Sequence, residues 1–314
     1  MRYDRIAVSG TGMMGPGIAT HFALSGARVI LVSRTAENAR NGVKQALRIA
    51  DWLADNGLVS AESVERVGDL LQTSTDPAVA VAEAQLFIES VPEDMALKQD
   101  YFAMLDAASS DAVLCSNTSG MSITEIARKC GRPQRIMTTH FWNPPHLMPL
   151  VEVVMGDRTD ESTAQSVVEF LRACGKVPVL VKKDRPGQLG NRIQQAMVRE
   201  CMNIVAEGIA SAEDVDLAVK AGVGLRTPVY GPFEHADMVG LDLVKAVQDY
   251  VLSDLSTAQH ALPIHDRKVS EGKLGQKSGE GMLQWPAGRA REVGNRRDRF
   301  LVEFLKLQKS GRLE

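Results

Sequence analysis

The chain has 314 residues, of which 44% are hydrophobic and 24% charged, and its formal net charge is -3. This length suits about two ordinary domains, and the composition is typical of a soluble globular protein with buried cores. A single small module and a disordered or fibrous chain are therefore excluded. The charge balance lacks the basic surplus that sequence-independent nucleic-acid binding requires, so we expect no nucleic-acid partner.

Apolar runs such as 29–32 and 177–181 have the length of strands, far short of the roughly 20 residues that span a bilayer. We expect no membrane partner. Because the N-terminal residues show neither a signal-peptide nor a lipidation pattern, we expect a cytoplasmic location.

The cysteines are widely spaced and form no Cys-x-x-Cys motif, which predicts reduced, mostly buried thiols and no metal site. They are Cys115, Cys130, Cys174 and Cys201.

Short β-rich runs alternate with helical patterns through the first half of the chain, which is typical of β-α-β units in a mostly parallel sheet. The expected strands cover residues 6–9, 28–32, 86–90, 113–116, 136–141, 151–154 and 178–181. Residues 35–75 are too many for a simple crossover between the second and third of these strands. They predict an inserted helical hairpin that turns near Asp55-Asn56-Gly57.

A charged turn containing Pro186-Gly187 follows the last expected strand, and no convincing strand lies beyond it. We therefore predict an α/β fold in which residues 1–183 form a Rossmann-type doubly wound sheet and residues 184–314 form an all-helical domain. Apolar residues at three- to four-residue spacing predict helices at 189–204, 212–221, 241–255 and 296–307. The last helix is locally basic with one apolar face, for which docking on its own domain is favoured over binding to a membrane surface.

A glycine-rich turn, Gly10-Thr11-Gly12-Met13-Met14-Gly15, directly follows the first expected strand and opens a helix. Gly10 permits a tight turn, Gly12 lets the backbone approach a pyrophosphate, and Gly15 lets the helix pack on the strand. The free N–H groups at the helix N-terminus favour phosphate. This segment, including Met13 and Met14, predicts a dinucleotide site, and a glycine turn without a ligand is the alternative.

Ser33 and Arg34 stand at the end of the second expected strand, where an enzyme that prefers NAD would place Asp or Glu against the ribose 2′-hydroxyl. A hydroxyl followed by a guanidinium suits a 2′-phosphate instead, because arginine binds phosphate with two charge-assisted hydrogen bonds. The pair predicts a preference for NADP(H), with NAD as a possible coenzyme. The alternative is that Arg34 stacks on the adenine and the enzyme accepts both coenzymes.

His140 and Glu152 lie on two expected strands joined by the proline-rich segment 143–149. That segment can fold the strands back so that the two side chains lie side by side. A carboxylate beside an imidazole favours its protonated form and fixes its tautomer, as a proton-transferring pair requires. Judged from the residues alone, a structural histidine and glutamate pair is the commoner case.

Six motifs in order along the chain resemble the 3-hydroxyacyl-CoA dehydrogenase superfamily. They are GTGMMGPGIA at 10–19, Val91-Pro92-Glu93 with Lys98, SNTSG at 116–120, HFWNPPHLMPLVEVV at 140–154, Arg185-Pro186-Gly187 with Asn191-Arg192, and Gly231-Pro232-Phe233. The resemblance implies a Rossmann domain followed by a helical domain that forms a homodimer. It also implies an NAD(P)-dependent oxidoreductase that interconverts a 3-hydroxy acid, or its CoA thioester, and the 3-oxo form.

The resemblance further implies a role for each of four catalytic residues. His140 would be the general base for the 3-hydroxyl proton in oxidation and the general acid in reduction. Glu152 would orient and charge His140. Ser119 and Asn191 would hold the substrate oxygen and polarise the developing carbonyl.

Three further residues, Glu93, Lys98 and Asn117, match positions of the family that line the nicotinamide and ribose side of the coenzyme. We regard Asn143 and Arg226 as candidates for contact with the substrate. Arg226 would meet a substrate carboxylate, and a surface salt bridge is an equally good interpretation of this arginine.

Some positions depart from the pattern of members that use CoA thioesters, in which the helical hairpin carries serine and lysine toward CoA. The matching positions here hold Ala46 and Leu53, while Gly120 and Gln188 replace a usual serine and a usual aromatic residue. Other branches of the superfamily act on free acids, so we favour a free 3-hydroxy acid over an acyl-CoA. A catalytically silent cofactor-binding protein, similar to the lens crystallin branch, is the alternative function.

Overall fold

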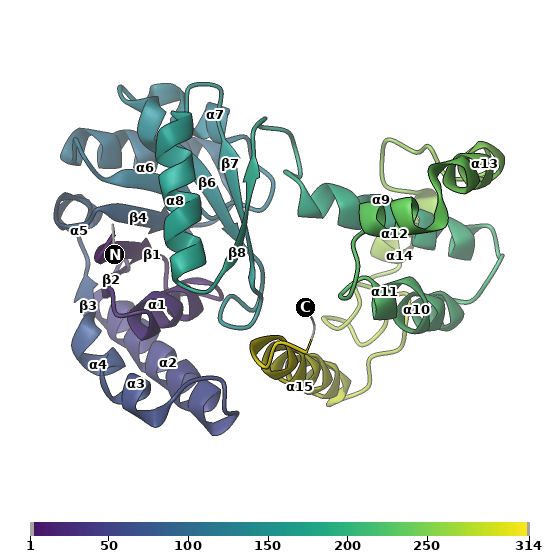
Figure 1. Cartoon of the computed structure of the whole chain (residues 1–314), viewed down its shortest axis with the longest axis horizontal. Coiled ribbons are helices and arrows are strands. Elements are labelled where there is room, and N and C mark those ends of the chain that lie inside the picture. Colours follow the sequence, from purple (N-terminus) through teal and green to yellow (C-terminus); the bar gives the residue numbers. More distant parts are fainter. Residues whose placement is uncertain (1–2, 313–314) are drawn as a thin grey trace. The chain divides into compact units, whose positions relative to one another are not determined.

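The computed structural model describes residues 3–312, and the chain divides into two units (Figure 1). Unit 1 takes the residues up to Arg192 together with Leu301–Lys306. Unit 2 takes Ile193–Phe300 and the residues from Leu307 onward.

Unit 1 contains an eight-stranded sheet in the order β3-β2-β1-β4-β5-β6-β7-β8. All neighbouring strands are parallel except β6 and β7, which are antiparallel. Because the chain winds outward from β1 in both directions, the strand order reverses between β1 and β4, and α/β sheets bind ligands at the carboxyl ends of the strands at such a point. The predicted doubly wound, Rossmann-type sheet is confirmed. The strands are β1 Arg5–Ser9, β2 Arg28–Val32, β3 Leu71–Ser74, β4 Leu86–Glu89, β5 Val113–Ser116, β6 Ile136–Phe141, β7 Leu150–Met155 and β8 Val177–Val181.

Helices cover both faces of this sheet. Alternate residues of β1 point to opposite faces, so Ile6 and Val8 belong to one buried cluster and Ala7 to the other. One cluster includes residues of α1 (Gly15–Leu24), α2 (Ala36–Asp55) and α8 (Glu161–Ala173). The opposite cluster includes residues of α5 (Pro77–Glu83), α6 (Met95–Ala108) and α7 (Ile123–Ile126). Two short 3-10 turns, Ala127–Lys129 and Pro133–Arg135, precede β6.

The segment 35–75 contains a strand that the sequence analysis does not predict. After α2 the chain turns at Asn56 and Gly57, and two short helices, α3 (Ala61–Glu65) and α4 (Val67–Leu70), lead into β3. In β3 only Leu71 is buried. An edge strand has a neighbour on one side only, so it needs no run of apolar residues that would reveal it in the sequence.

The described part of unit 2 consists of helices and turns, with only isolated bridges near Glu280 outside the helices. The predicted helices at 189–204, 212–221, 241–255 and 296–307 correspond to α9, α10, α13 and α15. Three others are too short to show a periodic apolar pattern. The helices are α9 Gly190–Ala206, α10 Ala212–Ala221, α11 Val223–Arg226, α12 Pro232–Val239, α13 Leu241–Val251, α14 Pro263–Ser270 and α15 Arg289–Lys309.

The last helix, α15, contributes its residues Leu301–Lys306 to unit 1. Val302 is buried there with Leu53 of α2, Leu58 and Leu147, and Leu301 packs against the same cluster. This differs from the expectation that the helix docks on its own domain. The apolar face of the helix packs instead on apolar residues at the end of α2, which belongs to unit 1. Within residues 3–312, no helix is long and apolar enough to cross a membrane.

Candidate active site

The glycine-rich turn lies between β1 and α1, at the carboxyl end of β1. Gly10 has a φ of 102° and a Cβ there would lie 2.4 Å from the carbonyl oxygen of Ser90. At Gly15 a Cβ would lie 1.7 Å from the carbonyl oxygen of Gly10. Both positions therefore require glycine, the first for its backbone conformation and both for the close approach of neighbouring backbone.

Gly12 differs from these two glycines, because a Cβ there would meet no atom within 4 Å. Its backbone faces open space beside the N-terminus of α1, which has no acidic residue in its first turn. Met13 is 74% exposed, and Met14 packs partly on the core. An exposed turn of this shape, at a helix N-terminus, fits the pyrophosphate of a dinucleotide.

The end of β2 lies next to this turn. The Ser33 Oγ is 3.1 Å from the Thr11 Oγ1, so the hydroxyl at the end of the strand is held against the glycine-rich turn. Arg34 is exposed and forms no ion pair within the described residues. A guanidinium in this position is available to an anionic ligand.

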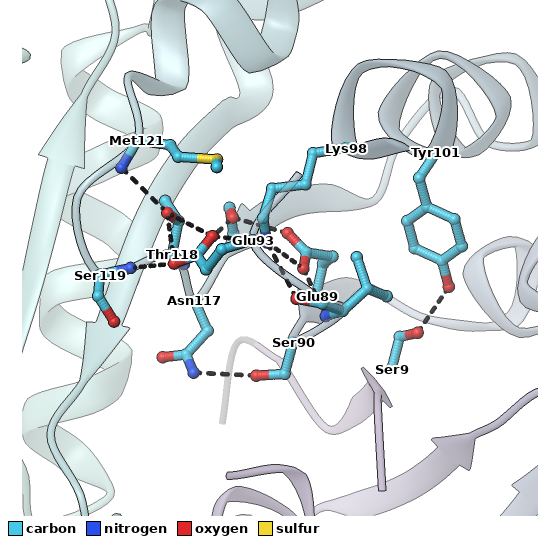
Figure 2. Close-up of polar contacts among 12 residues, drawn as sticks. Ser9, Glu89, Ser90, Glu93, Lys98, Tyr101, Asn117, Thr118, Ser119 and Met121 are labelled. Atoms are coloured by element: carbon cyan, nitrogen blue, oxygen red, sulfur yellow. Dashed lines mark hydrogen bonds and ion pairs between the residues drawn. The ribbon is translucent and has the colours of Figure 1, made fainter. Parts of the chain in front are cut away.

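Figure 2 shows a buried ion pair at the carboxyl end of β4 that the sequence analysis does not predict. The Lys98 Nζ of α6 lies 2.6 Å from Glu89 Oε1, and the two side chains are 1% and 0% exposed. Glu89 also accepts hydrogen bonds from the Ser116 hydroxyl and the Val91 N–H, both at 2.6 Å. A glutamate ending an apolar strand is the signal that could have identified this position.

The ion pair is connected to the loop after β5 through a second glutamate. Glu93 Oε2 lies 3.4 Å from the Lys98 Nζ, and Glu93 Oε1 accepts a hydrogen bond of 2.8 Å from the Ser119 N–H (Figure 2). The Thr118 hydroxyl also donates to Glu93, at 2.9 Å. Lys98 therefore contacts two carboxylates and links the end of β4 to the backbone of Ser119.

Asn117 connects three strand ends. Its side-chain amide donates to the Ser90 hydroxyl at 2.9 Å, and its Oδ1 accepts from the Phe141 N–H at 2.8 Å. The residue is buried, so its position is fixed by β4, β5 and β6 together. The predicted coenzyme residues Glu93, Lys98 and Asn117 thus lie in one connected network.

His140 and Glu152 face each other directly across β6 and β7. The antiparallel register pairs the two residues, and the His140 Nδ1 lies 2.7 Å from Glu152 Oε2. The exposed fractions of the residues are 6% and 0%. Within the described residues the His140 Nε2 has no protein hydrogen-bond partner, so it is available to a substrate hydroxyl.

Glu152 accepts four hydrogen bonds. Besides His140, the Trp142 indole N–H donates to Oε2 at 3.0 Å, and the N–H groups of Leu189 and Gly190 donate to Oε1 at 2.9 and 2.8 Å. Burial raises the pKa of Glu152, but the hydrogen bonds from His140, Gly190, Trp142 and Leu189 outweigh this effect and lower the pKa to about 2. The carboxylate is therefore ionised at neutral pH.

The start of α9 brings Asn191 to the loop after β5. The Asn191 side-chain amide donates to the Ser119 carbonyl oxygen at 2.7 Å, and the Gln188 amide donates to the Thr118 carbonyl oxygen at 3.0 Å. Ser119 and Asn191 therefore lie together, and the same short segment contacts Glu152. The Ser119 hydroxyl has no hydrogen-bond partner within the described residues.

The segment between β6 and β7 is fixed by a buried lysine. The Lys176 Nζ donates to the carbonyl oxygens of Pro145 and Met148, at 2.6 and 2.9 Å. Burial lowers the pKa of Lys176 to about 7. Of the two substrate candidates, Asn143 is exposed at the start of this segment, and Arg226 is exposed at the end of α11 in unit 2.

The four free cysteines lie outside this network, three of them buried as predicted. Burial raises the pKa of Cys115 to about 12, so this thiol is inert at neutral pH. The described residues contain no cluster of His, Cys, Asp and Glu that could hold a metal ion.

Two family models match the chain. The model for the 3-hydroxyacyl-CoA dehydrogenase NAD binding domain matches residues 5–185, and the model for the C-terminal domain of the same family matches residues 187–285. Together they cover most of the chain, and α15 lies beyond the second match.

Individual relatives agree with these matches. The chain is 34% identical over 305 residues to 5-formyl-3-hydroxy-2-methylpyridine 4-carboxylate 5-dehydrogenase of Mesorhizobium japonicum, covering 95% of this chain and 96% of the relative. It is 36% identical over 288 residues to human mitochondrial hydroxyacyl-coenzyme A dehydrogenase, covering 89% and 90%.

A solved structure is also similar over nearly the whole chain. It is a 5-formyl-3-hydroxy-2-methylpyridine 4-carboxylic acid 5-dehydrogenase, described as an NAD+ dependent dismutase, with a TM-score of 0.89, 33% identity and 98% coverage of both chains. The family matches and the fold assign an NAD-binding domain and an oxidoreductase that acts on a CH–OH group. This chain therefore belongs to the 3-hydroxyacyl-CoA dehydrogenase family.

Proposed function

We propose that the chain interconverts a free 3-hydroxy acid and its 3-oxo form by hydride transfer to and from a nicotinamide coenzyme, with His140 and Glu152 as the acid-base pair. The observation that carries this proposal is the 2.7 Å contact between the His140 Nδ1 and Glu152 Oε2. Among residues 3–312, the opposite nitrogen of the imidazole has no hydrogen-bond partner.

In oxidation, the substrate hydroxyl gives its proton to the His140 Nε2 while the C–O bond becomes a carbonyl. The hydrogen on the same carbon leaves with its electron pair, and the bound nicotinamide supplies the acceptor for this hydride. Glu152 stays ionised and stabilises the imidazolium that forms, because its pKa lies near 2. Reduction reverses each transfer.

Ser119 and Asn191 hold the substrate oxygen in this proposal. The Ser119 hydroxyl has no protein partner within residues 3–312, and the Asn191 amide keeps one N–H beyond the one it donates to the Ser119 carbonyl oxygen. Donors directed at an oxygen that gains negative charge stabilise the transition state of reduction more than the ground state. Asn143 and Arg226 remain candidates for contact with the rest of the substrate.

The helical hairpin supports the proposed substrate class. Ala46 and Leu53 occupy the positions that carry serine and lysine in members that use CoA thioesters, and here they are 0% and 4% exposed. Leu53 is buried in the cluster that includes Val302 of α15, so it presents neither charge nor surface to a CoA nucleotide. The similar pyridine-carboxylate dehydrogenase is named for a substrate that carries a free carboxylate.

The proposed function is tested by following the absorbance of reduced coenzyme while 3-oxo acids and 3-oxoacyl-CoA thioesters are added in parallel. We expect oxidation of the coenzyme by at least one free acid, with a higher kcat/KM than any thioester. A higher kcat/KM for a thioester would overturn the assignment of substrate class. No turnover with either class would favour the alternative of a silent cofactor-binding protein.

We further propose that NADP(H) is preferred over NAD(H), since Ser33 and Arg34 stand where the 2′-phosphate would lie. Arg34→Ala is expected to lower kcat/KM with NADP by about 10- to 100-fold, the effect of losing one or two charge-assisted hydrogen bonds. The kcat/KM with NAD should change by less than about threefold, since NAD has no 2′-phosphate for Arg34 to contact. Equal losses with both coenzymes, or a clear preference of the wild type for NAD, would contradict this assignment.

We also propose a homodimer formed through the helical residues of 184–314, and a coenzyme-binding role for residues 1–183. Unit 2 exposes many large apolar side chains on its helices, a pattern typical of protein interfaces. Light scattering at micromolar concentration is expected to give twice the mass of one chain, and a monomeric mass would refute the dimer. The exposed residues on these helices include Leu217, Leu225, Phe233, Met238, Leu241 and Tyr250.

A further inference from the structure

Trp142 lies directly after β6 and contacts both members of the proposed acid-base pair. Its indole N–H donates to Glu152 Oε2, the same oxygen that pairs with the His140 Nδ1. Its ring centroid lies 5.7 Å from that of the His140 imidazole, with an interplanar angle of 48°. The indole N–H and the His140 Nδ1 therefore both hold Glu152 Oε2 in place.

The same indole packs against the backbone at the start of α9. A Cβ on Gly190 would lie 2.4 Å from Trp142 Cζ2, so only glycine fits between helix and ring. The N–H groups of Gly190 and Leu189 donate to the other carboxylate oxygen, Glu152 Oε1. Trp142, directly after β6, and Glu152, on β7, together hold the first turn of α9.

The backbone that leads into this turn adopts a rare conformation. Gln188 has a φ of 53°, in the left-handed region that side chains other than glycine seldom adopt, and it is 4% exposed. Strain of this kind persists only where surrounding contacts impose it. Here the contacts are the hydrogen bond to the Thr118 carbonyl oxygen and the two N–H groups on Glu152.

We propose that Trp142 is a positioning residue for the hydride-transfer reaction. Its indole N–H fixes the orientation of the Glu152 carboxylate, which in turn orients the His140 imidazole. Its ring also packs against Gly190 and so keeps Asn191, at the start of α9, beside Ser119. This inference rests on the proposed roles of His140 and Glu152. Among the described residues, His140 is the one titratable side chain in contact with that carboxylate.

The decisive variant is Trp142→Phe, which keeps an aromatic ring but removes the N–H donor. We expect kcat to fall about tenfold, which corresponds to one hydrogen bond to a charged group, while KM changes less than about twofold. Trp52→Phe, the same change on α2, is the matched control, and its kcat should stay within about twofold of the wild type.

The pH profile separates positioning of the carboxylate from a general loss of structure. Without the indole N–H, more negative charge remains on Glu152 Oε2, which favours the protonated imidazole. Oxidation needs the neutral imidazole, so the acidic limb of kcat/KM for oxidation should move to higher pH by about half a unit in Trp142→Phe. A purely structural role would lower the whole profile without moving this limb.

A second variant tests the contact with α9. Gly190→Ala places a methyl group against the indole and should lower kcat, whereas the smaller ring in Trp142→Phe leaves room for that methyl group. The double variant should therefore be clearly more active than the product of the two single effects predicts. Additive effects would show that Trp142 and Gly190 are not coupled.

The outcomes distinguish this inference from the function on which it rests. If Trp142→Phe keeps the wild-type kcat and pH profile while His140→Ala is inactive, the role of Trp142 is refuted and the acid-base pair stands. If His140→Ala keeps the wild-type rate, the proposed function itself fails.

Discussion

His140→Ala should lower kcat by about 100- to 10,000-fold, the range expected when a general acid-base residue is removed. The variant loses the imidazole whose Nδ1 lies 2.7 Å from Glu152 Oε2 and whose other nitrogen has no hydrogen-bond partner in the described part of the chain. The measurement is the steady-state rate of reduction of the best 3-oxo acid at saturating coenzyme. The dissociation constant of the coenzyme, measured by fluorescence, should change little because the glycine-rich turn is untouched.

A matched control for this variant is His260→Ala. His260 is exposed in unit 2, so its loss removes a histidine of the same chain without affecting the acid-base pair. We expect its kcat to remain within about twofold of the wild type. If His140→Ala retains wild-type turnover, the assignment of the general acid-base residue is wrong.

Lys98→Ala should destabilise the protein by about 3–5 kcal/mol, because it leaves the Glu89 carboxylate buried and without its counter-charge. The pair is 1% and 0% exposed, so water cannot replace the lost ammonium group in the native state. The free energy of unfolding can be measured by urea titration, followed by far-UV circular dichroism. A decrease in the free energy of unfolding below about 1 kcal/mol would show that the pair behaves like an exposed surface ion pair.

Replacing both members of this pair separates stability from activity. Glu89→Leu combined with Lys98→Met should recover part of the stability, because an apolar pair of similar size leaves no buried charge, although the Ser116 hydroxyl and the Val91 N–H lose their acceptor. Activity should not recover in the same variant. Without the lysine, Glu93 loses its contact with the ammonium group, and because Glu93 holds the Ser119 N–H, the position of Ser119 is then less well fixed. Full recovery of kcat would show that the ion pair does not position the Ser119 loop.

Much of the fold could be predicted because it depends on local patterns. The glycine-rich turn identifies β1 and α1, since Gly10 and Gly15 are required by close backbone contacts. The approach of His140 to Glu152 could also be predicted, because a short proline-rich link between two strands favours an antiparallel pair. The register that places these residues opposite each other agrees with that expectation.

Other features depend on contacts between elements that the sequence pattern does not show. Glu89 and Lys98 are nine residues apart on a strand and a helix, and only the position of α6 beside β4 reveals that they form a buried pair. The contact of Trp142 with Gly190 joins the residue after β6 to the first residue of α9 in the same way. The apolar face of α15 is visible in the sequence, but its position beside Leu53 is not, because many surfaces could cover such a face. The cytoplasmic location stays a prediction, and some relatives are named as mitochondrial enzymes.

The most direct test of the account is a crystal structure of the chain with the reduced coenzyme bound. We expect the pyrophosphate on the turn 10–15 and the nicotinamide C4 facing the His140 Nε2, with space for one substrate carbon between them. A nicotinamide ring directed away from His140, or a coenzyme bound elsewhere, would contradict the proposed roles of His140 and Glu152.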